Sequence, residues 1–134
     1  MKRFSLLLML ALSFNGFAQT STKSSLEKIQ EVYGSYWNEV IKVDNDRQKG
    51  LTDLLETRTE IYEEKYFEGE KYEKLSSVSL FNKYNSDLKK DEVFDVNTFN
   101  ILKYDINFFS SRDKIYRIDG TNYIVYIKST KTNN

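Results

Sequence analysis

The spacing of apolar residues divides the chain into a helical first half and a strand-like last third. After a polar start, apolar side chains recur at alternating steps of three and four residues, which is the buried stripe of an amphipathic helix. Ser24, with Glu27 three residues later, forms a capping box at its beginning. We therefore predict a helix over 25–43, and Gly34 inside it permits the close approach of another element.

A second helix is predicted over 46–67. Its apolar positions are Leu51, Leu54, Leu55, Ile61, Tyr62 and Tyr66. The short polar link between the two helices favours an antiparallel helical hairpin, and one long bent helix is the alternative. Between residues 69 and 98 the pattern is mixed. We expect a short helix over 77–90, although Val78 and Leu80 also alternate as they would in a strand.

Apolar and polar residues alternate in the last third of the chain, as in half-buried strands. The pattern predicts strands over 102–108, 114–118 and 122–128, and Asp119-Gly120 between the last two is a strong hairpin signal. The predicted fold class is α+β, with an N-terminal helical hairpin packed on a C-terminal three-stranded antiparallel meander.

Residues 1–18 are predicted to be a cleavable signal peptide. Lys2 and Arg3 precede a compact apolar run, and the small residues Gly16 and Ala18 mark a cleavage site. The run is too short to span a bilayer, which takes about 20 residues. We expect an exported protein of the periplasm, the cell surface or the extracellular space, with no transmembrane segment in the mature chain and a single small domain over 19–134.

The composition excludes several chemistries. The chain has no Cys, no His and no Pro, so it has no disulfide, no thiol nucleophile and no Ser-His-Asp triad. A stretch beginning at Asn45 resembles a calcium loop, but Arg47 and Lys49 occupy positions where oxygen ligands are needed. The sequence therefore indicates no catalytic residue, no cofactor and no metal ligand.

The charged residues of the chain are nearly balanced overall, but acidic residues gather on the predicted second helix. Removing Lys2 and Arg3 from the 20 basic residues leaves 18 against 20 acidic ones, a net charge of −2, which gives no reason to expect nucleic acid as a partner. The candidate acidic face comprises Glu56, Glu60, Glu63 and Glu64, which share one side of the predicted second helix. Like charges at this spacing repel slightly. A cation, a basic partner or the basic C-terminal segment would offset the repulsion, and a simple solvated face is the other interpretation.

The last predicted strand has apolar residues on both faces. Ile124 and Tyr126 point away from the helices, and Ile115 on the neighbouring strand joins them. In a three-stranded meander this strand lies at an edge. Three accounts fit the pattern. Residues 75–98 cover that side, or the strand is central beside an undetected strand, or the face binds a protein partner or a second copy of the chain.

Three segments resemble small exported bacterial proteins of unknown function. The segments are Leu80-Phe81-Asn82-Lys83-Tyr84-Asn85, Phe99-Asn100-Ile101-Leu102-Lys103-Tyr104 and Tyr116-Arg117-Ile118-Asp119-Gly120-Thr121-Asn122-Tyr123. The resemblance covers the C-terminal half of the chain and implies no activity.

The sequence favours an exported, non-enzymatic binding or accessory module of the bacterial envelope. The alternatives are a small His-free hydrolase that uses carboxylates and a structural envelope protein. A hydrolase should gather carboxylates or a Ser–Lys pair in one pocket, whereas a binding module should expose an apolar patch.

The first testable prediction concerns processing. The exported protein should begin at Gln19, because small residues precede the bond between Ala18 and Gln19. Intact-mass measurement on protein recovered from the native envelope or medium tests this. A native protein that still carries residues 1–18 would contradict the prediction of export.

Overall fold

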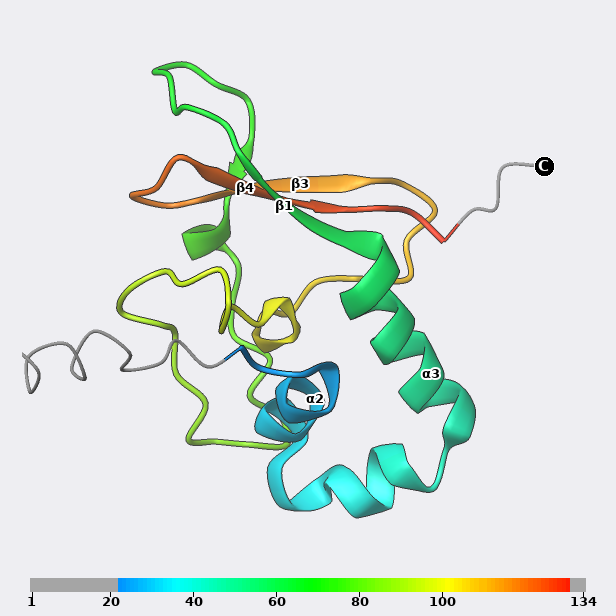
Figure 1. Cartoon of the computed structure of the whole chain (residues 1–134). Coiled ribbons are helices and arrows are strands. Elements are labelled where there is room, and N and C mark those ends of the chain that lie inside the picture. Colours follow the sequence, from blue (N-terminus) through cyan, green and yellow to red (C-terminus); the bar gives the residue numbers. More distant parts are fainter. Residues whose placement is uncertain (1–21, 131–134) are drawn as a thin grey trace, which may run out of the picture.

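The computed structural model describes residues 22–130, and the predicted signal peptide over 1–18 lies outside these residues. A four-stranded sheet lies on one side of the molecule, with the helices α2 (Ser25–Tyr33) and α3 (Asn45–Asp53) below it in the view of Figure 1. A long irregular stretch fills the space between α2 and the sheet. The predicted α+β class is confirmed in this coarse sense.

The first predicted helix begins at the predicted cap, but the prediction of one continuous helix over 25–43 is wrong, since the α-helix ends at Tyr33. The Ser24 hydroxyl accepts a hydrogen bond from the Glu27 amide at 3.1 Å, which caps α2. Gly34 ends the α-helix with φ +53°, a region that other residues avoid. The chain then continues as a 3₁₀ turn over Gly34–Tyr36 and a π-helical turn over Trp37–Lys42.

The close approach expected at Gly34 is also present. A Cβ at this position would lie 3.5 Å from the Asn85 Cβ. The Asn85 side chain donates a hydrogen bond to the Glu31 carbonyl oxygen at 2.8 Å, which holds the irregular segment against the end of α2.

The prediction of a second helix over 46–67 is wrong beyond Arg58. α3 passes into a π-helical turn over Leu54–Arg58, and the chain then enters strand β1 (Thr59–Glu63). β1 pairs antiparallel with β4 (Tyr123–Ile127), and Ile61 lies opposite Val125, which is fully buried. The β-branched Thr59 and Ile61 suit a strand, and pairing with a distant strand overrides the local helical spacing.

The sheet is mixed and has four strands in the order β1-β4-β3-β2, so the predicted three-stranded antiparallel meander is wrong. β2 (Glu73–Lys74) runs parallel to β3 (Lys114–Ile118), and β3 pairs antiparallel with β4 across the predicted Asp119-Gly120 turn. β4 is therefore a central strand, and the prediction that it lies at an edge is also wrong. Of the three accounts of its two apolar faces, the undetected flanking strand is confirmed.

The segment predicted as a strand over 102–108 has part of the expected burial but a different backbone. Leu102, Tyr104 and Ile106 are buried. The backbone, however, forms a 3₁₀ turn over Ile101–Lys103 and then a single bridge between Tyr104 and Leu80. The short helix predicted over 77–90 is absent, because that segment follows a 3₁₀ turn over Leu75–Ser77 as irregular chain.

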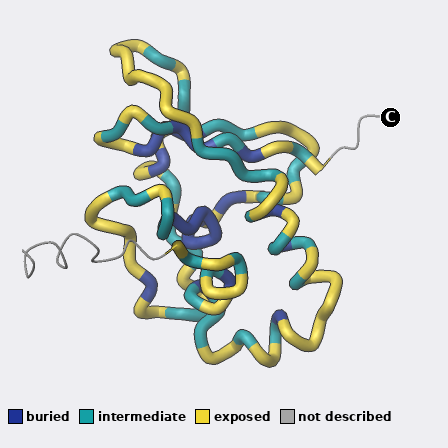
Figure 2. Tube along the Cα trace, viewed as in Figure 1, coloured by how far each residue is buried: buried dark blue, intermediate teal, exposed yellow. Residues whose placement is uncertain are grey.

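Asn100 anchors this central turn, which forms the buried middle of the molecule in Figure 2. Its side chain is 0 % exposed. The amide nitrogen donates to the Lys28 carbonyl oxygen of α2 at 2.8 Å, and the amide oxygen accepts from the Leu102 backbone at 3.1 Å. One side chain thus joins the first helix to the centre of the chain.

Lys103 extends the same connection. Its buried ammonium group lies 2.9 Å from Asp91 and 3.7 Å from Glu31, and its carbonyl oxygen accepts from the Phe81 amide at 2.7 Å. The pairing with carboxylates offsets the loss of hydration that burial of the ammonium group entails. Three separate segments, namely α2 and the chain around Phe81 and around Asp91, therefore converge on residues 100–103.

A second buried cation lies on the opposite face of the sheet. Arg117 is 2 % exposed and donates two hydrogen bonds to the Glu70 carboxylate, at 2.7 and 2.8 Å. The rings of Tyr66 and Tyr72 lie 5.7 and 5.9 Å from its guanidinium group. These contacts fix the loop over 64–72, which projects from the sheet on the side away from α2 and α3 in Figure 1.

We predict that Asn100→Ala lowers the free energy of unfolding by about 2 to 4 kcal/mol, because each buried polar group left without a partner costs about 1 to 3 kcal/mol. The control is Asn82→Ala, a change at an exposed position. Urea denaturation followed by circular dichroism measures both. Equal stabilities of the two variants would contradict the anchoring role of Asn100.

We also predict that the contribution of the Arg117–Glu70 pair is lost in acid. Hydrogen bonds from Arg117 hold the pKa of Glu70 below its usual value. A depressed carboxyl pKa gives stability that is present above the unfolded pKa of about 4.3 and is lost as the pH falls through the folded pKa. Glu70→Gln should therefore be less stable than wild type at neutral pH, and the difference should shrink in acid.

Urea midpoints of both proteins between about pH 7 and pH 3 test this linkage. Glu68→Gln, an exposed change in the same loop, is the matched control and should follow the wild type throughout. A stability difference for Glu70→Gln that stays constant over this range would show that the pair does not titrate as described.

Candidate functional site

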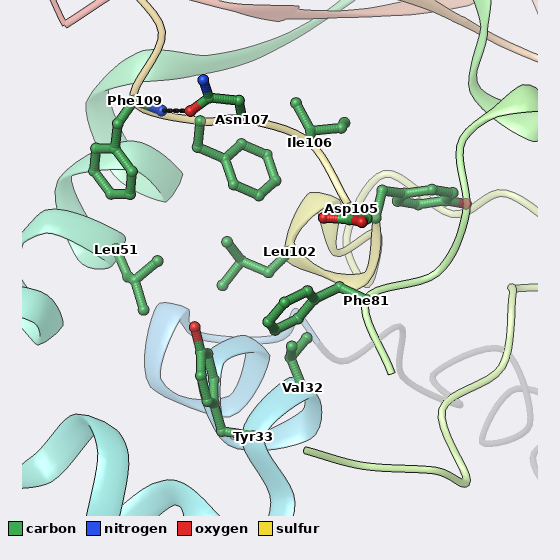
Figure 3. A pocket seen from close by; sticks show the side chains of 11 residues that line it. Val32, Tyr33, Leu51, Phe81, Leu102, Asp105, Ile106, Asn107 and Phe109 are labelled. Atoms are coloured by element: carbon green, nitrogen blue, oxygen red, sulfur yellow. Dashed lines mark hydrogen bonds between the residues drawn. The ribbon is translucent and has the colours of Figure 1, made fainter. Parts of the chain in front are cut away.

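A partly enclosed apolar cavity lies between α2, α3 and the segment that follows the central turn (Figure 3). We call it the aromatic cavity. Its volume is about 180 Å³, and its apolar walls are Val32, Leu51, Phe81, Leu102, Ile106 and Phe108. A dry cavity of about 150 Å³ with similar walls holds a benzene molecule. The aromatic cavity therefore has room for one ring or one branched aliphatic side chain.

Polar groups surround this apolar hollow. Asp105 and Asn107 lie at its exposed side, and Figure 3 shows the Tyr33 hydroxyl directed between Leu51 and Leu102. Burial raises the pKa of Tyr33, so its hydroxyl stays protonated near neutral pH. The hydroxyl has no hydrogen-bond partner within residues 22–130, which leaves it free to donate to a bound group.

Two residues of the cavity wall, Tyr33 and Phe81, belong to an aromatic cluster that extends to the surface. The rings of Tyr33 and Tyr84 stack with centroids 5.1 Å apart, and Phe81 lies 6.1 Å from Tyr33. Tyr36 completes the cluster at 5.7 Å from Tyr84 and is exposed. This cluster supports the Tyr33 and Phe81 rings of the cavity wall from behind.

Phe109 forms part of the rim of the cavity and is 57 % exposed. The guanidinium group of Arg58 lies 5.7 Å from its ring centroid and donates to the carbonyl oxygens of Phe108 and Lys128. The Asn107 side chain accepts a hydrogen bond from the Phe109 amide at 3.2 Å (Figure 3). These contacts hold the backbone of the rim while the Phe109 ring remains accessible.

The candidate interaction surface of Ile115, Ile124 and Tyr126 is brought together on the sheet face away from α2 and α3. Ile115 lies opposite Tyr126, and Ile124 lies opposite Arg117. Ile124 is buried beside the 64–72 loop, whereas Ile115 and Tyr126 are half-buried. The Tyr126 hydroxyl donates to the Asp113 carboxylate. The role of these residues in binding stays a prediction.

The candidate acidic face is dispersed by the helix-to-strand change. Glu56 lies in the π-helical turn and accepts a hydrogen bond from Ser25 at 3.0 Å, whereas Glu60 in β1 pairs with Lys128 at 2.6 Å. Glu63 ends β1, and Glu64 begins the loop, where its carbonyl oxygen accepts from Arg117 at 2.6 Å. The prediction that the four share one helix face is wrong, because the helix ends before three of them.

A second hollow contains the residue types that the hydrolase alternative requires, namely a Ser, a Lys and several carboxylates. A cleft of about 460 Å³ beside the β3–β4 turn is lined by Ser76, Lys90, Asp91, Glu92 and Asp119 among others, and we call it the acidic cleft. The Ser76 hydroxyl donates to Asp119 at 2.8 Å, and the Lys90 ammonium group donates to the Ser76 backbone oxygen at 3.2 Å. Lys90 is therefore not the base on this hydroxyl, as a Ser–Lys nucleophile would require.

The described part of the chain, residues 22–130, holds no group of three or more acidic side chains arranged to bind a metal ion. The stretch that resembles a calcium loop lies along α3 and the π-helical turn that follows it. Within the same residues, every helix is too short or too polar to cross a membrane.

The periodicity of the sequence places Tyr33, Trp37, Tyr104 and Phe108 on inward faces and so predicts that they belong to the core. Tyr104 is buried as predicted, but Tyr33 and Phe108 are only partly buried and border a hollow. A signal was present, because aromatic residues occur close together in three separate segments: Tyr33 with Tyr36, Phe81 with Tyr84, and Phe108 with Phe109. The pairing of these segments depends on the irregular chain that no local pattern describes.

Comparisons with models of known protein families, with curated proteins and with solved structures found no significant match. The functional proposal therefore rests on the side chains around the two hollows.

Proposed function

We propose that this protein is an exported, non-enzymatic binding module of the bacterial envelope. It holds a protein partner, or a second copy of the chain, through one apolar side chain inserted into the aromatic cavity. The single observation that carries the proposal is the apolar cavity of about 180 Å³ with an accessible aromatic rim. The periplasm, the cell surface and the extracellular space are all compatible locations.

The size of the cavity favours a side chain over a free metabolite. Sites for small molecules usually enclose about 300 to 1,000 Å³, whereas this cavity has about 180 Å³. Interfaces commonly concentrate their binding energy in one apolar or aromatic anchor that fills a pocket, surrounded by groups that exclude water. Phe109, which lines the cavity and is exposed, is placed to form part of such a surrounding.

The polar groups of the cavity support binding rather than catalysis. The Tyr33 hydroxyl and the exposed Asp105 and Asn107 can orient a bound group by hydrogen bonds. The lining contains no Ser, Lys or second carboxylate that would complete a nucleophile and base.

The test uses a capped amino acid as a probe. N-acetyl-phenylalanine amide should shift the backbone amide signals of residues 32–33, 51 and 102–109 in two-dimensional NMR spectra, and N-acetyl-alanine amide should leave them in place. Leu51→Phe should weaken binding of the first probe at least about tenfold, because the larger ring occupies part of the hollow without leaving a new void.

Leu26→Phe is the matched control, since Leu26 lies on α2 at an exposed position outside the cavity lining. It should bind the probe as the wild type does. Signal changes scattered over the surface, or equal binding by Leu51→Phe and wild type, would contradict the proposed use of the aromatic cavity.

A further inference from the structure

The acidic cleft has an apolar floor of its own. Tyr104 is the one residue that lines both this cleft and the aromatic cavity. The floor consists of Leu75, Phe94, Phe99, Tyr104 and Ile118. Phe94 and Phe99 meet edge to face with ring centroids 5.5 Å apart, and Phe99 lies 6.3 Å from Tyr104. At about 460 Å³ the cleft is within the usual range for a small-molecule site.

The walls of the cleft carry an excess of negative charge. Asp91, Glu92 and Asp119 line it, against the single basic residue Lys90. Asp91 is already paired with the buried Lys103, and Asp119 accepts hydrogen bonds from the Ser76 amide and hydroxyl at 2.9 and 2.8 Å. The Glu92 carboxylate has no partner within the described chain, so it is available to a cation.

Tyr104 gives an independent indication of a ligand. The residue is 9 % exposed, yet its hydroxyl has no hydrogen-bond partner among residues 22–130. Because every fully enclosed side-chain polar atom of these residues has a partner, the hydroxyl must reach open space. Its ring packs on Phe99, which lines the acidic cleft and not the aromatic cavity.

The charges near Tyr104 are those of residues that line the acidic cleft. Burial raises the pKa of Tyr104, and the charges of Asp91 and Asp119 raise it further. The hydroxyl therefore stays neutral near neutral pH, with a lone pair and a proton both available. Because the hydroxyl reaches open space and has no protein partner, a ligand in the cleft can form a hydrogen bond with it.

We propose that the acidic cleft binds a primary ammonium group carried on an apolar chain, as in a lysine side chain or a free alkylamine. The ammonium group lies among Glu92, Asp119 and the Tyr104 hydroxyl, all of which accept hydrogen bonds. The apolar chain lies along Phe94 and Phe99, whose ring faces also attract positive charge. A neutral ligand loses the charge interaction, and an anion is repelled.

The experiment compares n-pentylamine with its neutral counterpart n-pentanol by NMR titration of the purified protein. Pentylamine should shift the amide signals of residues 75–76, 90–94 and 118–121 and should bind at least about tenfold more tightly than pentanol, as charge-assisted hydrogen bonds are worth about 1.5 to 3 kcal/mol. A parallel titration with Nα-acetyl-lysine methylamide distinguishes the two sources. Tighter binding than pentylamine assigns the cleft to lysine side chains, and weaker binding assigns it to free amines.

Three variants complete the test. Glu92→Gln at an exposed site and Tyr104→Phe, which keeps the ring, should each weaken pentylamine binding about threefold to tenfold and leave pentanol binding unchanged. Glu68→Gln, at an exposed position of the 64–72 loop, should have no effect. Pentanol binding as tight as pentylamine binding, or wild-type pentylamine affinity in both Glu92→Gln and Tyr104→Phe, would overturn the proposal. Leu51→Phe should bind pentylamine normally, so the two hollows are tested separately.

Discussion

The hydrogen bonds of the buried Asn100 side chain are the constraint on which the rest of the structure depends. Residues 78–113 contain no strand and only one short helical turn. Regular helix and sheet hydrogen bonds therefore pair few of the backbone groups in this segment. Buried backbone groups need partners in all folded proteins. The Asn100 side chain is the hydrogen-bond partner of the Leu102 amide and of the Lys28 carbonyl oxygen, and it thereby joins the irregular segment to α2. The core thus forms around a polar anchor and not only around a sheet face.

The same anchor positions both hollows. Residues 102–109 form one wall of the aromatic cavity, and Phe99 and Tyr104 form part of the floor of the acidic cleft. Tyr104 lies in both linings, two residues beyond the amide that Asn100 holds. A change in the central turn would therefore alter the two sites together, although their chemistry differs: one is apolar with a neutral hydroxyl, and the other carries an excess of carboxylates.

The sequence allowed some local features to be predicted and left most of the topology undetermined. The cap at Ser24, the close approach at Gly34 and the Asp119-Gly120 hairpin were predicted correctly. The end of the α-helix at Gly34 was not predicted, because the apolar spacing continues past this residue. β1 was missed because its apolar residues also fit a helical period, and its pairing with β4 spans more than 60 positions. β2 has only two residues and carries no pattern at all.

In the candidate sites, too, local features were predictable from the sequence and long-range contacts were not. Alternation correctly indicated that Leu102, Tyr104 and Ile106 are buried, but it did not indicate that Lys103 is buried as well or that the backbone lacks sheet partners. The two hollows are built from segments far apart in the sequence, and their positions depend on buried polar contacts such as those of Lys103 and Arg117. Periodicity describes apolar faces, and it contains no information on which charged residue is buried with which partner.

Native-state hydrogen exchange tests the central claim that the fold is organised around the Asn100 turn. The account predicts that the amides of Leu102 and Tyr104, and that of Phe81 which donates to Lys103, exchange as slowly as the amide of Val125 in the central strand. Rapid exchange at these three amides, at rates typical of the exposed 64–72 loop and with the sheet still protected, would contradict it.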